Sequence, residues 1–353
     1  MKKLFIIVII IVLILLISGV IYYLRAPKAP EEKIVFQKGM SYATWSKDAY
    51  GELFSKESLG ELAATGTEWV AFVVTWYQDR YNSVIIERGG RTPSDESLIK
   101  AIGWAKELGL KVMLKPHLDL AKDIPGAWRG EIDHYTDEDW TRWFESYRDF
   151  VVHYARIAQE RDVELFCVGT ELTNPAVLKP ELWKEIVIKD VKKVYQGLLT
   201  YAANWKDEYQ DVEFWDELDF AGIDPYFPLS NEDKPSLEEL KEAWKKYLIE
   251  IEDWQSKIEK PVIFTEIGYK SSTGAARAPW EHVPGRRAEL ELQANCYKAL
   301  LETFWDKDWF YGVYWWYWGT NKRMGGKNHR GFLLQNKPVV EVLKEWYSKK
   351  RNP

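Results

Sequence analysis

The chain has 353 residues, 46% of them hydrophobic, which is enough for one large domain or two ordinary ones. Its net charge is −6, and because acidic and basic residues are interspersed, the sequence excludes a basic face for nucleic acid. Aromatic residues make up 15% of the chain, with 19 Trp, a content that suits the faces of sugars as well as a Trp-rich core.

The N-terminal segment is the most apolar part of the chain. Residues 4–24 are almost wholly apolar and have basic residues on both sides, and a run of this length spans a bilayer. We therefore predict an N-terminal transmembrane helix in residues 1–25, with the remainder of the chain extracytoplasmic. A cleaved signal segment, which would give a secreted protein, is the alternative. Residues 26–37 are Pro-rich and charged, and we expect a short linker there.

Residues 38–350 alternate between short apolar runs and amphipathic segments, the pattern of βα units with a parallel sheet. The predicted strands are Lys38–Thr44, Trp69–Thr75, Lys111–His117, Val163–Glu171, Leu198–Ala203, Leu218–Tyr226, Pro261–Glu266 and Gly312–Trp318. The predicted helices include Ser94–Leu108, Asp137–Gln159, Pro180–Val194, Ser236–Ile258 and Arg287–Trp305. This order predicts an α/β fold, a single (β/α)8 TIM barrel. A doubly wound open sheet is the alternative, but no glycine-rich dinucleotide turn follows the first strand.

The two cysteines are predicted in different layers of this barrel. Cys167 has the inward parity of its strand, whereas Cys296 lies in a predicted outer helix. We expect two buried free thiols that do not reach each other.

Two predicted strands end in a glutamate. Glu171 follows the apolar run 166–169, and Glu266 follows 262–264. Because the carboxyl ends of parallel strands meet at one end of a barrel, we expect the two carboxylates to face each other there. Two carboxylates that flank a glycosidic bond can hydrolyse it: one protonates the leaving oxygen, and the other attacks the anomeric carbon or activates water. This chemistry requires no metal and no organic cofactor.

Other strand ends carry polar and aromatic residues that we expect at the same rim, and His117 is one of them. His117 and Asp119 have an H-x-D spacing, but no paired histidine motif lies on the first strand, so we predict no metal site. The absence of a G-x-S-x-G turn argues against a serine hydrolase. Trp205 and Trp280 fit either sugar platforms or loop packing, and Arg129 fits solvated surface equally well.

Four segments carry a resemblance to a known family: VGTEL (168–172), DPYFPL (224–229), TEIGYKS (265–271) with APW (278–280), and VYWWYWG (313–319). In these the chain resembles glycoside hydrolase family 113, the β-mannanase family of clan A. The resemblance implies that Glu171 is the general acid/base and Glu266 the nucleophile of a retaining double displacement. It also implies that Tyr226 hydrogen-bonds the nucleophile, and that Trp316 or Trp318 forms the floor under the sugar.

One position departs from the clan. Most members have Asn before the acid/base, where it bonds the sugar 2-hydroxyl, and this chain has Thr170. Thr170 or Asn204 would then supply that contact. The expected substrate-binding residues are His117, Thr170, Asn204, Trp205, Tyr226, Trp280, Trp316 and Trp318.

The resemblance implies cleavage of β-1,4-mannosidic bonds in mannan, glucomannan or manno-oligosaccharides. The expected partners are thus a polysaccharide or oligosaccharide and, through the N-terminal helix, the cell membrane. Nothing in the sequence fixes the contact that reads the axial 2-hydroxyl of mannose, so a β-glucan or β-galactan is an alternative substrate. A carbohydrate-binding barrel without catalysis is a further alternative, against which the presence of both glutamates argues.

Overall fold

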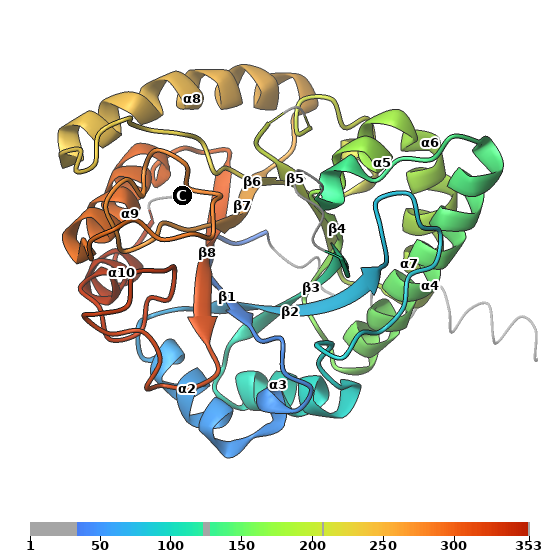
Figure 1. The fold of residues 1–353 in the computed structure, drawn as a ribbon, viewed down its shortest axis with the longest axis horizontal. Helices are drawn as coiled ribbons and strands as arrows, with labels where there is room; N and C mark the ends of the chain where they lie inside the picture. The colour runs from blue at the N-terminus through green and yellow to red at the C-terminus, as the bar shows by residue number, and fades with distance from the viewer. Residues whose placement is uncertain (1–33, 123–127, 207, 352–353) are drawn as a thin grey trace, which may run out of the picture. The chain divides into compact units, whose positions relative to one another are not determined.

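The computed structural model contains eight parallel strands that close into a barrel in chain order, with β8 hydrogen-bonded to β1 (Figure 1). The strands are β1 Gln37–Ala43, β2 Trp69–Gln78, β3 Lys111–Leu120, β4 Leu165–Thr170, β5 Leu198–Asn204, β6 Phe220–Asp224, β7 Val262–Ile267 and β8 Phe310–Gly319. Each corresponds to a predicted strand. The predicted TIM barrel is therefore confirmed, and the open sheet is excluded.

The structure describes residues 34–122, 128–206 and 208–351. The chain divides into the units 1–35 and 36–353, and the barrel is the second. Within the described ranges, no helix is long and apolar enough to cross a membrane. The predicted anchor over 4–24 lies outside the described residues, as does most of the predicted linker, whose last residue, Gln37, already belongs to β1.

Helices surround the barrel (Figure 1). They are α2 Leu53–Ala63, α3 Asp95–Glu107, α4 Asp137–Glu160, α5 Thr173–Leu178, α6 Pro180–Leu182, α7 Lys189–Val194, α8 Leu237–Ile258, α9 Leu290–Phe304 and α10 Val339–Tyr347, with short 3-10 turns at Ala49–Gly51, Arg129–Glu131 and Trp215–Glu217. Side-chain caps begin the predicted helices α3 and α8: Ser94 accepts from Ser97, and Ser236 forms a capping box with Glu239. The predicted helix Pro180–Val194 is instead interrupted by a π-helical turn, Trp183–Ile188.

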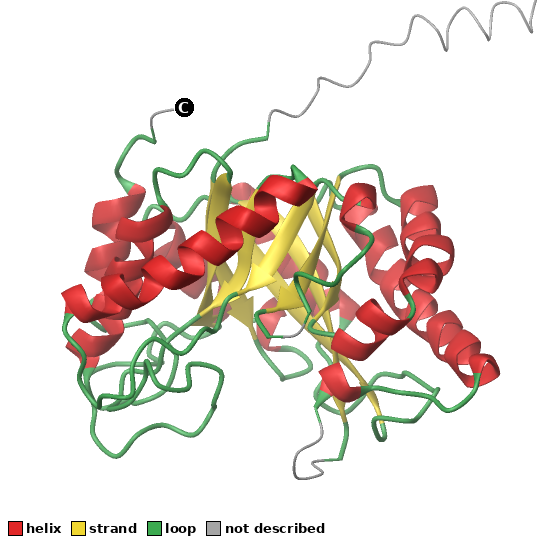
Figure 2. Cartoon of the chain, turned by 90° about the horizontal axis from the view of Figure 1, so that it is seen from above, coloured by secondary structure: helices red, strands yellow, loops and turns green. Residues whose placement is uncertain are grey.

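Apolar side chains form two cores. The barrel interior is filled by Trp69, Ala71, Met113, Leu165, Cys167, Ala202, Phe220, Ile263 and Tyr314, and the larger core lies between the strands and the helices. Cys167 belongs to the first core and Cys296, in α9, to the second, and both are free thiols as predicted. Because apolar groups fill the barrel interior, the polar side chains at the carboxyl ends of the strands are available for chemistry. The longest loops gather at the end toward which the strands point (Figure 2).

A bulge in β8 decides which tryptophans face the barrel axis. Met40 and Tyr42 of β1 pair with Trp315 and Trp318, so three steps along β8 oppose two along β1. One extra residue reverses the alternation of a strand. Trp316 and Trp318, which would share a face in a regular strand, therefore lie on opposite faces.

Candidate active site

Glu266 lies in β7, and two buried donors hold its carboxylate. Lys115 Nζ in β3 donates to Oε2 at 2.9 Å, and the Tyr226 hydroxyl donates to Oε1 at 2.9 Å. The second contact is the hydrogen bond that the sequence led us to expect. These two charge-assisted hydrogen bonds, one to each oxygen, fix the orientation of the carboxylate.

Lys115 connects Glu266 to a second acidic group. Its fully buried ammonium lies 3.3 Å from Asp224 Oδ2 in β6, and Asp224 also accepts from the Thr265 hydroxyl at 2.6 Å. Burial by itself lowers the pKa of Lys115, but the charges of Asp224 and Glu266 outweigh it and raise that pKa. Burial raises the pKa of Asp224 well above its usual value, and Lys115 opposes this. Only one sign of this network is visible in the sequence, a lysine that directly follows the apolar run 112–114.

Glu171 follows β4 and has a different environment. Its Oε1 accepts from Asn204 Nδ2 at 2.8 Å, and its side chain is 15% exposed. Burial raises the pKa of Glu171, and the charge of Arg129 opposes this rise. The negative charge of Glu266 raises the pKa further. A carboxyl group with a raised pKa retains its proton at higher pH, which is what a general acid requires.

Arg129, which the sequence left open as solvated surface, is part of the site. Its side chain is only 18% exposed, and its NH2 lies 2.7 Å from Asp119 Oδ1. The other terminal nitrogen of the guanidinium group, Nη1, lies 3.7 Å from Glu171 Oε2 and 3.4 Å from His117 Nδ1. No periodicity reveals this role, because Arg129 lies in the loop beyond β3 and reaches back over the strand ends.

His117 is buried between these groups. Burial lowers its pKa well below the usual value, and Arg129 and Lys115 lower it further. The imidazole is therefore neutral, and because a guanidinium only donates, Nδ1 is the acceptor and Nε2 carries the proton. Nε2 lies 3.9 Å from Glu266 Oε2 and has no hydrogen-bond partner among the described residues.

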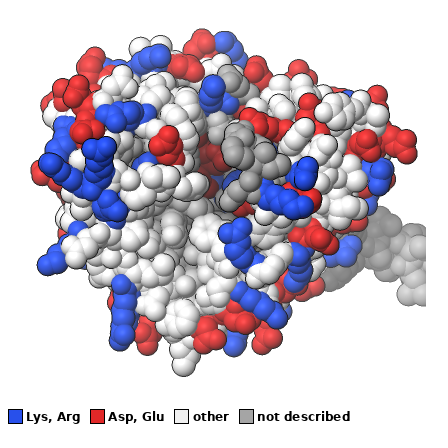
Figure 3. Space-filling model, in the orientation of Figure 1, with Lys and Arg blue, Asp and Glu red and all other residues white. Residues whose placement is uncertain are grey.

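A cavity of about 750 Å³ lies over Glu171. Its walls are Arg91, Asp119, Leu120, Lys122, Trp128, Arg129, Glu171, Asn204, Trp205, Lys206, Trp280 and His282. The rings of Trp205 and Trp280 are 5.2 Å apart, and Trp280 is 43% exposed, so both predicted platforms reach the groove. Figure 3 shows a hollow near the centre of this face, with acidic and basic side chains interspersed around it.

The remaining predicted residues divide into two groups. Trp316 lies parallel to His117, with an interplanar angle of 6° and centroids 6.2 Å apart. Trp318 follows the bulge and faces away from the barrel axis, toward the helices. It is 3% exposed and donates its indole N–H to Ser58 in α2. The Thr170 hydroxyl is buried and lies 3.9 Å from Cys167 Sγ. The structure thus brings Trp316 to the site and turns Trp318 away from it.

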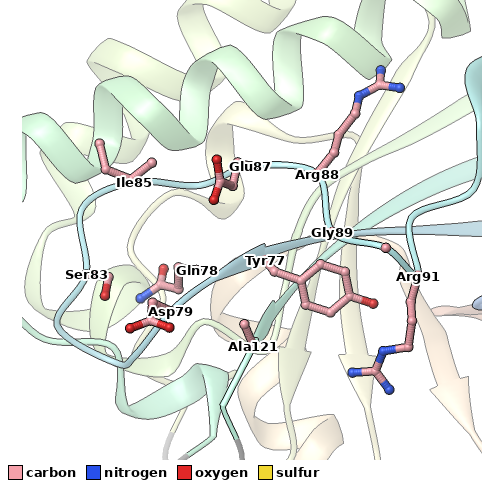
Figure 4. A pocket seen from close by; sticks show the side chains of 11 residues that line it. Tyr77, Gln78, Asp79, Ser83, Ile85, Glu87, Arg88, Gly89, Arg91 and Ala121 are labelled. Atoms are coloured by element: carbon pink, nitrogen blue, oxygen red, sulfur yellow. The ribbon is translucent and has the colours of Figure 1, made fainter.

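A second hollow of about 440 Å³ adjoins the groove beyond the end of β2 (Figure 4). Arg91 lines both cavities, and its guanidinium lies over the Tyr77 ring, 5.6 Å from the centroid. Lys122 of the groove pairs with Asp79 of this hollow at 2.8 Å. In Figure 4, Arg91 and Tyr77 lie at one end, and Ser83 and Ile85 at the other. Neither candidate catalytic glutamate contributes to this hollow.

Paired carboxylates at the strand ends of a barrel, beside an aromatic groove, are typical of glycoside hydrolases. Comparison with known families identifies the particular one. The sequence profile of Glycoside Hydrolase Family 113 matches residues 40–337, so the chain belongs to this family and is a glycoside hydrolase. A search of curated proteins returned no match.

Solved structures agree with this family. A structure described as a complex of a GH113 β-1,4-mannanase is 30% identical, covers 90% of this chain and 100% of its own, and has a TM-score of 0.80. The GH113 β-mannanase of Alicyclobacillus acidocaldarius in complex with ManMIm is 27% identical, covers 90% and 98%, and has a TM-score of 0.80. The β-glucuronidase of Ruminococcus gnavus, 14% identical over 89% of this chain and 50% of its own, has a TM-score of 0.59 and shares the fold alone.

Proposed function

We propose that the enzyme cleaves β-1,4-mannosidic bonds in mannan, glucomannan or manno-oligosaccharides with retention of anomeric configuration. Glu266 is the nucleophile and Glu171 the general acid/base. The observation that carries this assignment is the unequal environment of the two carboxyl groups. Lys115 and Tyr226 donate one hydrogen bond to each oxygen of Glu266, so a cation and a hydroxyl hold the carboxylate in place, as suits a nucleophile. Glu171 accepts from a neutral amide, and burial raises its pKa, which suits a group that begins the reaction protonated.

The reaction has two steps. In the first, the Glu266 carboxylate attacks the anomeric carbon while Glu171 gives its proton to the glycosidic oxygen, so the bond to the leaving sugar breaks and a glycosyl ester forms. In the second, Glu171, now a carboxylate, takes a proton from water as the water oxygen attacks the same carbon. The ester bond breaks, Glu266 is regenerated as a carboxylate, and Glu171 is protonated again.

Two neighbours are suited to hold the sugar during these steps. Trp316 supplies a flat apolar ring parallel to His117, of the kind on which sugar rings stack. The His117 Nε2–H, which lacks a partner among the described residues, is suited to donate to a sugar hydroxyl beside Glu266. Trp205 and Trp280 are suited to stack on sugars farther along the groove.

The choice of mannan is supported by the family and by the similar solved structures, which are described as β-1,4-mannanases. The test is activity of the purified enzyme on β-mannan, glucomannan, β-glucan and β-galactan, beside Glu171→Gln and Glu266→Gln. We expect manno-oligosaccharides to be released by the wild type, and a loss of at least about 10³-fold in each variant. Activity on another glycan that both variants lose would keep the mechanism and reject mannan. A folded protein that hydrolyses none of these glycans would favour a carbohydrate-binding barrel without catalysis.

We further propose that residues 4–24 anchor the enzyme in the cell membrane with the barrel outside the cytoplasm. This proposal is supported by the apolar sequence and its basic flanks alone. Membrane fractionation of the full chain, with N-terminal sequencing of the mature protein, is the test. An intact N-terminus in the membrane fraction is expected, whereas a mature protein that begins after residue 24 in the medium would show secretion instead.

A further inference from the structure

We propose that Glu208 is a positioning residue that holds Glu171 in its reactive conformation. The proposal rests on the function proposed above, because it concerns the step in which Glu171 acts as the acid. Glu208 follows β5, is 1% exposed, and takes no direct part in the mechanism. It lies behind the ends of β4 and β5, where its carboxyl group accepts hydrogen bonds from three residues, two in β5 and one at the start of α5.

Each of the three donors is connected to Glu171, either through a further hydrogen bond or through the neighbouring backbone. Oε2 accepts from the backbone N–H of Asn204 at 2.7 Å, and Asn204 is the residue whose amide donates to Glu171. Oε2 also accepts from the Thr173 hydroxyl at 3.0 Å, in the first turn after Glu171. Oε1 accepts from the Tyr201 hydroxyl. That hydroxyl in turn accepts from the backbone N–H of Leu172 at 3.0 Å.

These contacts surround Glu171, whose backbone conformation is unfavourable for a residue with a Cβ. Glu171 has a φ of 51°, in the left-handed region that residues with a Cβ rarely adopt. Such a conformation persists where the surroundings over-determine it. The Glu171 N–H is fixed to Ala202 O at 2.8 Å, and the next N–H, that of Leu172, is fixed through Tyr201 to Glu208. Glu208 therefore secures both the peptide after Glu171 and the amide that orients the Glu171 carboxyl group.

A buried carboxyl group is an unfavourable choice for a simple packing position. The pKa of Glu208 is raised to about 8, chiefly by burial and also by the charge of Glu171. The hydrogen bonds from Tyr201 and Asn204 lower this pKa and so limit the rise. Two separate oxygens are nevertheless required to satisfy Tyr201 on one side and Asn204 with Thr173 on the other. A carboxyl group presents an oxygen to each side in either protonation state, because a protonated Oε1 donates to the Tyr201 hydroxyl while Oε2 still accepts.

The test separates positioning of the acid from general stability. For each variant, kcat/KM is measured on a manno-oligosaccharide and on the matching dinitrophenyl glycoside, whose leaving group departs without protonation. Glu171→Ala calibrates the response and should lose far more activity on the oligosaccharide than on the dinitrophenyl glycoside. We expect Glu208→Ala to lose about 10²-fold on the oligosaccharide and less than about threefold on the dinitrophenyl glycoside, because a misplaced acid affects only the first substrate.

Tyr201→Phe keeps the ring, removes the hydroxyl that connects Glu208 to Leu172, and should show the same selectivity with a loss of about tenfold. The matched control is Glu250→Ala in α8, because Glu250 also accepts from a tyrosine hydroxyl, that of Tyr209, at 2.8 Å, but contacts no segment beside Glu171. The control should leave the ratio of the two kcat/KM values unchanged.

Equal losses on both substrates, or none, in folded Glu208→Ala and Tyr201→Phe would overturn the proposal. Circular dichroism and thermal melts establish folding, and if Glu208→Ala does not fold, Tyr201→Phe decides. A different result would count against the proposed function instead: a Glu171→Ala enzyme that loses both substrates equally would remove Glu171 from the acid role, whatever Glu208 does.

Discussion

The buried lysine beside the two carboxylates makes the most demanding prediction. Lys115→Met keeps an unbranched side chain that is one atom shorter and removes the charge that lies 2.9 Å from Glu266 and 3.3 Å from Asp224. At an effective dielectric constant of about 20, each contact corresponds to about 5 kcal/mol of attraction before the cost of burying the charges. Loss of one member of a buried ion pair costs about 3–5 kcal/mol of unfolding free energy. The melting temperature should fall by about 6–10 °C.

The loss should depend on pH in a defined direction. Burial already raises the pKa of Asp224 and Lys115 opposes this, so the substitution raises that pKa further. A carboxyl group whose pKa is raised by folding contributes stability at low pH that is lost as pH rises. The variant should therefore be most destabilised at neutral and alkaline pH and approach the wild type toward pH about 4. The alkaline limb of its activity should also move to higher pH, because the charge of Lys115 lowers the pKa of the proposed acid, Glu171, and the substitution removes that charge.

Thermal melts and pH–rate profiles of the purified variant test this reasoning. The control is Lys106→Met, because Lys106 pairs with Glu164 at 2.6 Å but both side chains remain partly exposed, at 28% and 17%. An exposed pair contributes about 1 kcal/mol or less, so the control should melt within about 2 °C of the wild type. A Lys115→Met enzyme that is as stable as the control at neutral pH, with an unmoved alkaline limb, would refute the argument.

Three further predictions concern single side chains. Tyr226→Phe removes the hydroxyl that donates to Glu266, so steady-state kinetics should show a decrease in kcat/KM of about 10- to 100-fold with an unchanged melt, and an unaffected rate would contradict this. Trp280→Ala should raise KM for long manno-oligosaccharides by about two- to tenfold without lowering the melting temperature, because the ring is 43% exposed; an unchanged KM would remove it from the groove. Burial lowers the pKa of Lys337 to about 7. For a lysine, a pKa that folding lowers means that stability falls as pH drops from about 10 to about 7 and levels off below that; melts of Lys337→Met between these pH values should depend less on pH, and an equal pH dependence would argue against a buried, uncharged amine.

The fold was predictable because each of its signals is local. Eight apolar runs separated by amphipathic segments define the barrel without knowledge of any contact, and the parity of one strand places Cys167 inside it. The positions of Glu171 and Glu266 follow from the same rule, since both close an apolar run whose carboxyl end must lie at the rim. The bond between Tyr226 and Glu266 came from family resemblance rather than from pattern.

The rest depends on geometry that no local pattern encodes. The regular alternation of side chains would place Trp318 on the same face as Trp316. The bulge in β8 reverses that alternation, and no pattern in the sequence reveals the bulge. Arg129 lies beyond the end of β3, and its return to Glu171 depends on the path of a loop. Lys115 was visible as a charge in a strand, but its partners lie on β6 and β7, far along the chain.

The central claim is that Glu266 forms a covalent bond to the sugar. The most direct measurement uses a fluorinated mannosyl inactivator, whose electron-poor ring slows hydrolysis of the glycosyl ester, followed by mass spectrometry of the digested enzyme. We predict a single sugar attached to the peptide that carries Glu266, and none in Glu266→Gln. A sugar attached at Glu171, or no covalent product together with inverted anomeric configuration of the released sugar, would contradict the account.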